Sequence, residues 1–360
     1  MNMSFGRRVK VTLEGSSHGE TVGVTVDGLP AGEAVDLAEL RAFLQRRRPG
    51  RNAFSSSRQE PDEPEFLTGL NQNVLTGEPL YAVIPNRDAH SADYDALRHT
   101  PRPGHADYTA WLQTGEIPAG GGAFSGRMTA PLCVAGGIAL QILRRRGIAV
   151  GAHLLSVGEV EDEPFPVMPD AALFEKIAGY RLPVCRKEAA EKMEKAIDMA
   201  KQAGDSLGGV IECAAVGVPA GLGEPRFDGI PNRLAAALFG IPAIKGVEFG
   251  SGFAGAHARG SENNDPFYYE NGTVRTRTNH AGGLLGGIST GMPLVVRVAV
   301  KPTPSILREQ ETVDLTTGAP AVITVRGRHD ACIAPRAVPV VEAVTALVLL
   351  DLLEEQNGAE

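Results

Sequence analysis

The sequence predicts an α+β fold made of two similar halves within one large domain. The chain has 360 residues, enough for one large or two fused domains with a well-buried core. Segments typical of strands and of helices follow one another, and no linker or break in composition separates independent domains. A Gly-Leu-Pro-Ala-Gly motif at residues 28–32 reappears as Gly-Val-Pro-Ala-Gly at residues 217–221. This repeat, with a period of about 190 residues, favours a duplicated unit over two unrelated domains.

The first part of the chain is predicted to form strands around one helix. Alternating or β-branched patterns predict strands at residues 8–13, 21–26, 65–70 and 80–84. The polar stretch between the first two strands, residues 14–20, is a place for a catalytic loop. A helix is predicted from its N-cap, Asp36, to Arg48, where Pro49 and Gly50 end it.

Residues 85–124 show little strand or helix periodicity and are rich in Asp, His, Pro and Gly. A segment of about forty residues without regular structure is uncommon inside a compact domain and is usually functional. We therefore expect a binding site or a lid here.

The rest of the chain continues the mixture of strands and helices. Strands are predicted at residues 148–157, 209–218 and 294–300. Helices are predicted at residues 129–146, 186–203 and 337–355, with one more that opens at Pro231. The last helix is apolar over a broad face, so we expect it in the core or at a subunit interface.

Composition excludes several classes of function. The net charge of −8 argues against a nucleic-acid-binding or anionic-membrane protein, because phosphate groups require a positive surface. No segment has the length and apolar character of a membrane span, so the chain is expected to be cytoplasmic. The cysteines include no C-x-x-C pair, and we expect reduced, mostly buried thiols without disulfides or metal: Cys133, Cys185, Cys213 and Cys332.

Histidines and arginines point to an anion site. Four histidines lie beside small or charged residues in predicted loops: His18, His105, His280 and His329. No pair has the i,i+4 spacing of a helical zinc site, so acid–base chemistry is favoured over a metal. Residues 41–58 contain six arginines and no Asp or Glu, while Arg102 and Arg127 flank the long loop. Since guanidinium groups pair with carboxylate and phosphate, a small polyanion is the predicted ligand.

Glycine clusters fit the same ligand. Residues 120–122 are all glycine and precede Ser125 and Arg127 at a predicted helix start, a typical anion site. A second cluster comprises Gly282, Gly283, Gly286 and Gly287. Neither cluster matches a P-loop or a G-x-G-x-x-G fingerprint, which disfavours ATP or Rossmann-type NAD binding. Residues 301–305, Lys-Pro-Thr-Pro-Ser, suit a phosphate but also an ordinary turn.

Taken in order, the motifs of the chain resemble those of the chorismate synthase family. They are Gly-Ser-Ser-His-Gly at 15–19, Val-Asp-Gly-Leu-Pro at 26–30, Arg-Arg-Arg-Pro-Gly at 46–50, Arg-Pro-Gly-His-Ala-Asp-Tyr at 102–108, Gly-Asp-Ser-Leu-Gly-Gly at 204–209, Asn-His-Ala-Gly-Gly at 279–283 and Gly-Arg-His-Asp at 327–330. The similarity runs from about residue 5 to residue 350, and the ordered set is far more specific than any single motif.

This resemblance implies a fold, a reaction and partners. The implied fold is a β-α-β sandwich with pseudo-two-fold internal symmetry, assembled as a homotetramer. The implied reaction is the anti 1,4-elimination of phosphate from 5-enolpyruvylshikimate 3-phosphate to give chorismate, the last common step of the shikimate pathway. It requires reduced FMN without net redox change. The reductant is NADPH or an external flavin reductase, and the lack of a nicotinamide fingerprint favours the latter.

The resemblance also assigns residues. In the catalytic set His18 protonates the departing phosphate, His105 lies beside the flavin, and Asp330 assists removal of the substrate proton. The substrate anions are assigned to Arg47, Arg48 and Arg127. The FMN contacts are assigned to Ser125, Ala243, Gly286, Lys301, Pro302, Thr303, Pro304, Ser305 and Arg328.

The sequence departs from the family pattern mainly on the expected flavin side. The departures are Ser16, Ala53, Ala123, Phe124, Met128, Pro242 and Pro304. A cation lost at Ala123 is expected to weaken FMN phosphate binding, because a charged hydrogen bond contributes about 1.5–3 kcal/mol. An active enzyme with altered flavin contacts is therefore favoured over a non-catalytic flavin- or anion-binding paralogue. A metal-dependent hydrolase is the third alternative.

Overall fold

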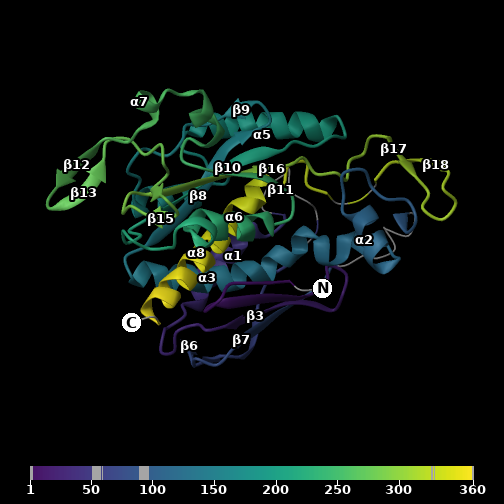
Figure 1. Cartoon of the computed structure of the whole chain (residues 1–360). Helices are drawn as coiled ribbons and strands as arrows, with labels where there is room; N and C mark the ends of the chain where they lie inside the picture. The colour runs from purple at the N-terminus through teal and green to yellow at the C-terminus, as the bar shows by residue number, and fades with distance from the viewer. Residues whose placement is uncertain are drawn as a thin grey trace.

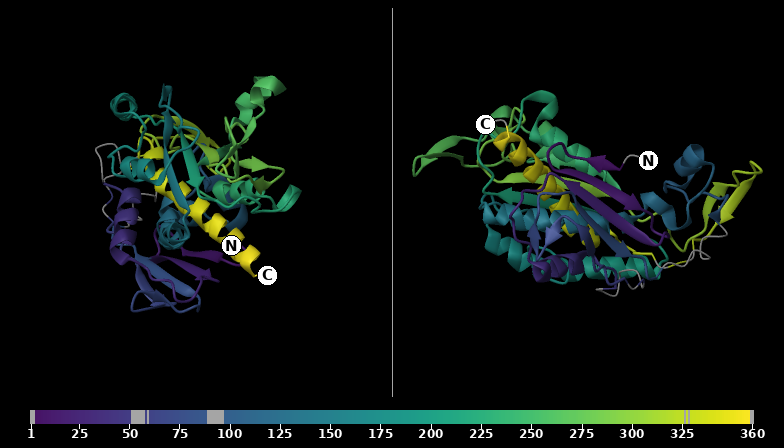
Figure 2. Two further views of the ribbon diagram at one scale, coloured as in Figure 1. Left: turned by 90° about the vertical axis from the view of Figure 1, so that its left-hand side faces the viewer. Right: turned by 90° about the horizontal axis from the view of Figure 1, so that it is seen from below.

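The structure is a computed structural model, and it describes residues 3–50, 58, 60–88, 97–325, 327 and 329–358. Two five-stranded antiparallel sheets enclose a layer of helices (Figures 1 and 2). The β-α-β sandwich expected from the sequence is therefore confirmed.

The first part of the chain supplies one sheet and two helices of the middle layer. Its elements are β1 (Ser4–Phe5), β2 (Lys10–Gly15), β3 (Thr21–Asp27), α1 (Leu37–Arg47), β4 (Glu65–Thr68), β5 (Leu70–Asn71), β6 (Val74–Leu75), β7 (Leu80–Pro85), α2 (Asp107–Thr114), the 3₁₀ segments Ala119–Phe124 and Gly126–Met128, and α3 (Thr129–Arg145). The strand order in the sheet is β1-β2-β3-β7-β4.

The remaining elements supply the second sheet and the other central helices. They are β8 (Ala149–Val157), β9 (Val160–Glu161), α4 (Ala171–Ala178), α5 (Lys187–Gln202), β10 (Gly209–Val216), α6 (Ile230–Phe239), β11 (Ile244–Phe249), α7 (Gly260–Asn263), β12 (Phe267–Glu270), β13 (Thr273–Thr276), β14 (Leu284–Leu285), β15 (Ile288–Ser289), β16 (Leu294–Val300), β17 (Gln310–Val313), β18 (Pro320–Ile323) and α8 (Ala334–Asn357). The order in this sheet is β11-β16-β10-β8-β9.

The core lies between the sheets. Strand β3 buries the alternate residues Val22, Val24 and Val26 completely, as its β-branched pattern requires. These side chains belong to one apolar cluster with residues of α3 and α8, the two helices that pack most closely in the middle layer. Among the described residues one helical stretch, 126–145, has the length and hydropathy of a membrane span, but 89% of it is buried between the sheets, as in a core helix.

The two sheets follow the same order of elements. With the intervening elements left out, the first half has the order β2, β3, α1, β4, β7 and α3. The second half has the order β8, β10, α6, β11, β16 and α8. Both repeated motifs adopt one backbone conformation: φ is +82° at Gly28 and +80° at Gly217, then +84° at Gly32 and +89° at Gly221. Such values favour glycine. A single domain with an internal repeat stays a prediction. The shared element order and the matching glycine conformations support it.

The largest difference from the sequence prediction lies in residues 85–124. Instead of a loop throughout, this region contains α2 and a 3₁₀ segment. Helix α2 has no side-chain N-cap and buries only Asp107 and Ala110. The apolar period that reveals a longer helix is therefore missing from its sequence.

Candidate active site

A cavity of about 510 Å³ lies where loops of both halves meet the start of α8. Its size falls within the range of about 300–1,000 Å³ typical of small-molecule sites. Of the predicted site residues, those that line it are His18, Arg47, His105, Ser125, Arg127, Ala243, Lys301, Thr303, Pro304, Ser305 and Asp330. The fold thus brings together residues from seven separate stretches of the chain.

The charge of the lining is predominantly positive. Its cationic side chains are Arg47, Arg58, Arg102, Arg127, Lys301 and Arg336, against three carboxylates, Glu60, Asp88 and Asp330. Three histidines, His18, His105 and His329, also line the cavity. Within a chain of net charge −8, this local excess favours a small anionic ligand.

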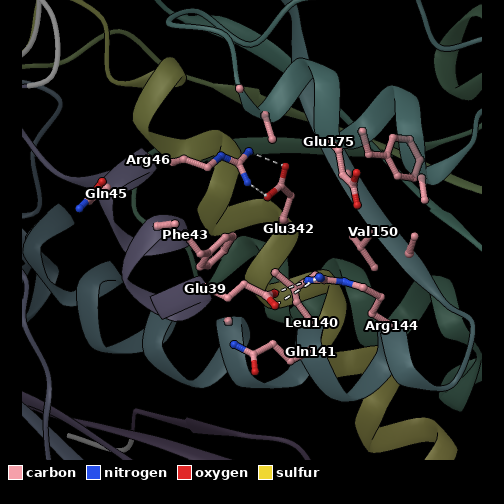
Figure 3. Close-up of a pocket in the computed structure, with 18 of the residues that line it drawn as sticks. Glu39, Phe43, Gln45, Arg46, Leu140, Gln141, Arg144, Val150, Glu175 and Glu342 are labelled. Carbon is pink, nitrogen blue, oxygen red and sulfur yellow. Dashed lines mark hydrogen bonds and ion pairs between the residues drawn. The ribbon is translucent and has the colours of Figure 1, made fainter. Parts of the chain in front are cut away.

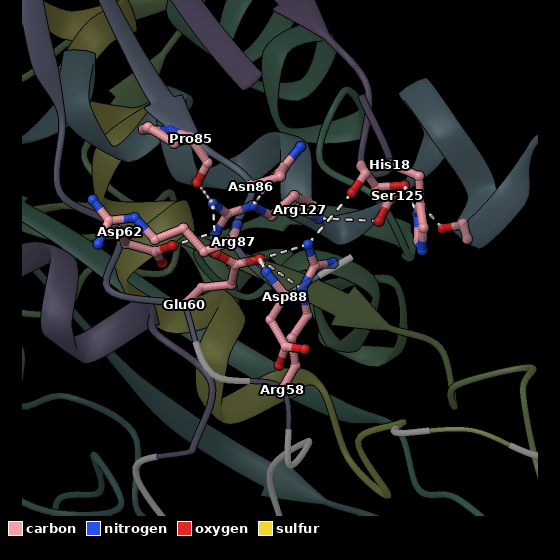
Figure 4. Close-up of polar contacts among 12 residues, drawn as sticks. His18, Arg58, Glu60, Asp62, Pro85, Asn86, Arg87, Asp88, Ser125 and Arg127 are labelled. Carbon is pink, nitrogen blue, oxygen red and sulfur yellow. Dashed lines mark hydrogen bonds and ion pairs between the residues drawn. The ribbon is translucent and has the colours of Figure 1, made fainter. Parts of the chain in front are cut away.

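Arg47 and Arg127 are held together by the buried carboxylate of Asp62. Figure 4 shows Asp62 with Arg127. An Arg47 Nη lies 2.6 Å from one Asp62 oxygen, and Arg127 donates to the other. Burial by itself would raise the pKa of Asp62, but the two guanidinium groups lower it below its ordinary value. Thr129 accepts from Arg47 at 3.1 Å and Asn86 from Arg127 at 2.8 Å. The two cations are therefore preorganised despite their mutual repulsion.

Glu60 organises the neighbouring wall (Figure 4). Its carboxylate accepts from Arg58 at 2.7 Å and from the backbone N–H groups of Arg87 and Asp88 at 3.1 and 3.2 Å. Arg127 lies 3.6 Å from the second oxygen. This places the guanidinium of Arg58 close to His18, since Arg58 also donates to the Ser17 carbonyl at 3.4 Å.

His18 lies on the predicted catalytic loop between β2 and β3. Its Nδ1 is 3.0 Å from the Ser17 hydroxyl, which donates to the Gly120 carbonyl at 3.3 Å. A Cβ on Gly120 would lie 1.9 Å from Cε1 of His18, and φ at Gly120 is +60°. The first glycine cluster thus leaves the space that the imidazole occupies.

His105 is oriented by a buried ion pair. Its Nδ1 lies 2.6 Å from Asp107, which also accepts from Arg102 at 2.7 and 2.8 Å. Arg102 and Asp107 are buried, whereas the His105 ring reaches the cavity. Ser305, an expected FMN contact, accepts from Arg102 at 3.2 Å. One network therefore joins His105 to the 301–305 segment.

Asp330 lies shortly before the start of α8 and lines the same cavity. It accepts from Arg336 at 2.5 Å, and Arg336 donates to the backbone carbonyl of Arg47 at 3.0 Å. This arrangement couples the carboxylate to the end of α1, where Arg47 lies.

The 301–305 segment offers polar groups to a ligand. Oγ1 of Thr303 is buried without a hydrogen-bond partner among the described residues. Lys301 donates to the Gly104 carbonyl, and burial together with the nearby Lys245 lowers the pKa of its ammonium group. Ala243, at φ +73°, accepts from the Lys301 backbone at 2.9 Å. A buried orphan hydroxyl and a half-buried cation on the same segment fit a phosphate-bearing cofactor such as FMN.

Some predicted site residues lie elsewhere. Arg48 caps the C-terminus of α1 and lines a separate cavity of about 790 Å³ bounded by α1, α3, α4 and β8 (Figure 3). Gly286 lies in the β14–β15 turn, and Pro302 is exposed and does not line the site. Arg328 and Ala53 lie outside the described residues. The roles assigned to Arg48, Gly286, Pro302 and Arg328 stay predictions.

The second glycine cluster does not line the site either. A Cβ on Gly282 would lie 2.5 Å from the backbone nitrogen of Gly250, so its φ of +64° serves backbone packing. His280, predicted beside it, is 3.1 Å from the Asn263 carbonyl and also lies outside the cavity. The part that this cluster plays in ligand binding stays a prediction.

Four departures from the family pattern border the cavity: Ala123, Phe124, Pro242 and Pro304. Met128 is buried. The sequence prediction missed three charged residues: Glu60 and Asp62, which are buried, and Arg336, which is half-buried. The one available signal was that an acidic stretch at residues 60–65 directly follows the arginine-rich segment, as a charge partner would.

Fold and site together define a class of protein: an α+β sandwich with a cation-lined cavity that His18 and His105 also border. The family model "Chorismate synthase" matches residues 9–353. The chain belongs to the chorismate synthase family.

Individual relatives agree over the whole length. The "Chorismate synthase" of Thermococcus gammatolerans is 48% identical, with 99% of this chain and 98% of that protein covered. The "Chorismate synthase" of Lancefieldella parvula is 45% identical, with 99% of each covered. A solved structure, "Crystal Structure of Chorismate Synthase", superposes with a TM-score of 0.77 at 29% identity and covers 98% of this chain and 94% of that one.

Proposed function

We propose that the chain catalyses the anti 1,4-elimination of phosphate from 5-enolpyruvylshikimate 3-phosphate, giving chorismate, with reduced FMN as cofactor. One observation carries the proposal beyond family membership. His18, His105 and the Arg47–Asp62–Arg127 group converge on one cation-lined cavity. A substrate with a phosphate and two carboxylates needs such a lining.

The arginines are proposed to bind and orient the substrate. Because Arg47 and Arg127 are already hydrogen-bonded to Asp62, their side chains lose little conformational entropy when the anion binds. Arg58 extends the same wall toward His18. Guanidinium groups in fixed positions lower the activation free energy, because they hold the substrate in the reactive orientation before the chemical step.

The histidines and Asp330 are proposed to handle protons. His18 protonates the departing phosphate, while His105 keeps a fixed orientation through Asp107. Asp330, held by Arg336, assists removal of the substrate proton on the other side of the cavity. The phosphate leaves with the electrons of the broken C–O bond. The electrons of the broken C–H bond form a new double bond while the existing ring double bond shifts toward the carbon that lost the phosphate, so no net oxidation occurs.

Reduced FMN is proposed to bind along residues 301–305 and Ser125, where Thr303 has its orphan hydroxyl and Lys301 its ammonium group. When bound, it supplies electron density transiently to the substrate as phosphate departs. A separate flavin reductase is the proposed source of reducing equivalents, with NADPH as the alternative. Bleaching of oxidised FMN on anaerobic mixing with NADPH and the protein alone would favour the alternative.

The decisive assay measures both products. Purified protein, photoreduced FMN and substrate are mixed anaerobically, and phosphate and chorismate are expected in equal amounts. FMN titration with and without substrate separates the enzyme from a non-catalytic paralogue, because the enzyme is expected to bind flavin more tightly with substrate present. Flavin binding without release of either product contradicts the proposal.

A glycine pair provides a matched test of His18. In Gly120→Ala the new Cβ displaces the imidazole, so turnover is expected to fall by about 10²–10⁴. Gly115→Ala introduces similar strain at φ +76° but meets no atom within 4 Å, and its turnover is expected to match the wild type. Wild-type turnover in both Gly120→Ala and Gly115→Ala would show that His18 has no part in the mechanism.

A further inference from the structure

A second cluster of ligand-type side chains lies in the other half of the molecule. It consists of His153 on β8, Asp162 just after β9 and Cys185 just before α5. None of the three lines the candidate active site. His153 and Asp162 are buried, and Cys185 is half-buried. The imidazole, carboxylate and sulfur atoms all lie within 4.8 Å of one another.

The two separations from the His153 ring are close to the edges of a tetrahedral metal site. Nδ1 of His153 lies 3.4 Å from Oδ2 of Asp162 and 3.7 Å from Sγ of Cys185. Zinc binds nitrogen and oxygen at about 2.0–2.1 Å and sulfur at about 2.3 Å, which at tetrahedral angles gives edges of about 3.3–3.6 Å. The Leu154 carbonyl, 3.1 Å from the same Nδ1, borders the cluster as well. A dication can therefore contact all three ligands with only small side-chain shifts.

Glu212 supplies an independent observation. It is the cross-strand partner of His153 on β10, and its Oε2 lies 3.1 Å from Nε2 of His153. Glu212 is fixed in turn by the Phe165 N–H at 2.6 Å and by Arg297 at 2.9 Å. Metal-bound histidines typically donate their second ring N–H to a carboxylate in this way. The contact leaves Nδ1 to face Asp162 and Cys185.

The charges also suit a dication. A Cys185 thiolate and the Asp162 carboxylate would neutralise it within a buried setting. Asp162 is preset for this role, because the backbone N–H groups of Cys185 and Arg186 donate to it at 2.5 and 3.1 Å. A ligand set of sulfur, imidazole and carboxylate favours zinc over magnesium or calcium.

We propose that His153, Asp162 and Cys185 bind one transition-metal dication of the zinc class, with Glu212 orienting the imidazole and water in the fourth position. The metal would join β8 and β9 to the start of α5. This site is independent of the proposed catalytic function. Its ligands lie far apart in sequence without a C-x-x-C or H-x-x-x-H pattern, so spacing alone predicted no metal.

The wild-type chain allows a direct test. Cys185 is the one cysteine of the four that is not buried, so a thiol-alkylating reagent reports on it selectively. Stoichiometric Zn²⁺ is expected to slow the alkylation of Cys185 at least about tenfold, and a chelator should restore the original rate. An unchanged rate would overturn the proposal and leave a protonated His153 between two carboxylates as the arrangement present.

Metal content provides the second measurement. Untagged full-length protein is incubated with Zn²⁺, desalted and analysed, and about one zinc per chain is expected. Cys185→Ala and His153→Gln should lose it, whereas His257→Gln, which changes an exposed histidine, should retain it. With Co²⁺, a thiolate charge-transfer band is expected in the wild type and not in Cys185→Ala. Equal zinc retention in Cys185→Ala contradicts the proposal, and the alkylation test remains decisive if His153→Gln does not fold.

Discussion

At the scale of single residues, Asp107 decides how His105 is presented. This fully buried carboxylate accepts from the His105 ring and from two guanidinium nitrogens of Arg102. Burial by itself would raise the pKa of Asp107, but the hydrogen bonds from Arg102 and His105 lower it well below its ordinary value. The folded state thus stabilises the ionised form of Asp107.

Replacing this charge should reduce catalysis without removing the side chain's shape. In Asp107→Asn we expect turnover to fall by about 10-fold to 100-fold, because the imidazole loses its orienting carboxylate. Steady-state kcat and KM would be measured beside Asp314→Asn, which changes an exposed carboxylate outside the site and should behave as wild type. Unchanged kcat in Asp107→Asn would show that His105 needs no such partner.

The same substitution predicts a pH dependence of stability. The folded-state pKa of Asp107 lies below its unfolded value of about 3.8. Its contribution to the free energy of unfolding is therefore complete above about pH 3.8 and is lost as the pH falls from there through the folded-state pKa. The difference in unfolding free energy between wild type and Asp107→Asn should therefore shrink from pH 6 to pH 2, measured by urea unfolding. If the difference in unfolding free energy grows toward low pH, the pKa of Asp107 is raised by folding and not lowered.

Residue chemistry also explains which part of the site could be predicted. The family motifs placed His18, His105, Asp330, Arg47 and Arg127 correctly around one cavity. The buried carboxylates that hold the arginines were missed, because an acidic stretch such as residues 60–65 resembles a solvated turn until tertiary contacts bury it.

At the scale of elements, prediction succeeded where the local pattern was strong. Strand β3 and helix α1, with its Asp36 N-cap, were confirmed to within a residue or so. Helix α4 was not predicted: it has only eight residues and buries just Phe174 and Ile177. Short helices of this kind are fixed by the sheet they cover more than by their own period.

The crossing of α3 and α8 should be sensitive to a single methyl group. A Cβ on Gly136 would lie 2.2 Å from Cβ and 2.5 Å from Cα of Ala343. Although alanine gains about 1 kcal/mol in helix propensity, we expect Gly136→Ala to lose about 1–3 kcal/mol of unfolding free energy through overpacking. Gly179→Ala, at the end of α4 with its nearest contact at 3.5 Å, should change stability little. Urea unfolding measures both, and a Gly136→Ala variant as stable as wild type contradicts the close packing.

At the scale of the whole molecule, the β12–β13 hairpin projects from the sandwich (Figures 1 and 2). Phe267 and Tyr269 alternate onto one face of it, and Val274 is the cross-strand partner of Tyr269. These side chains are 63%, 79% and 45% exposed. An apolar face on a projecting arm fits burial against another subunit, which supports the homotetramer as a proposal.

The arm makes the assembly testable with two adjacent tyrosines. Tyr269→Ser removes apolar area from the exposed face and is expected to shift the assembly toward smaller oligomers in sedimentation velocity at micromolar concentration. Tyr268→Ser changes the opposite face, where the ring lies 5.3 Å from the guanidinium of Arg277, and should leave the oligomer intact. Dissociated Tyr269→Ser protein should still bind a small anion such as phosphate, because Arg47, Asp62 and Arg127 all belong to the same chain. An unchanged sedimentation coefficient for Tyr269→Ser would exclude this face as a subunit contact.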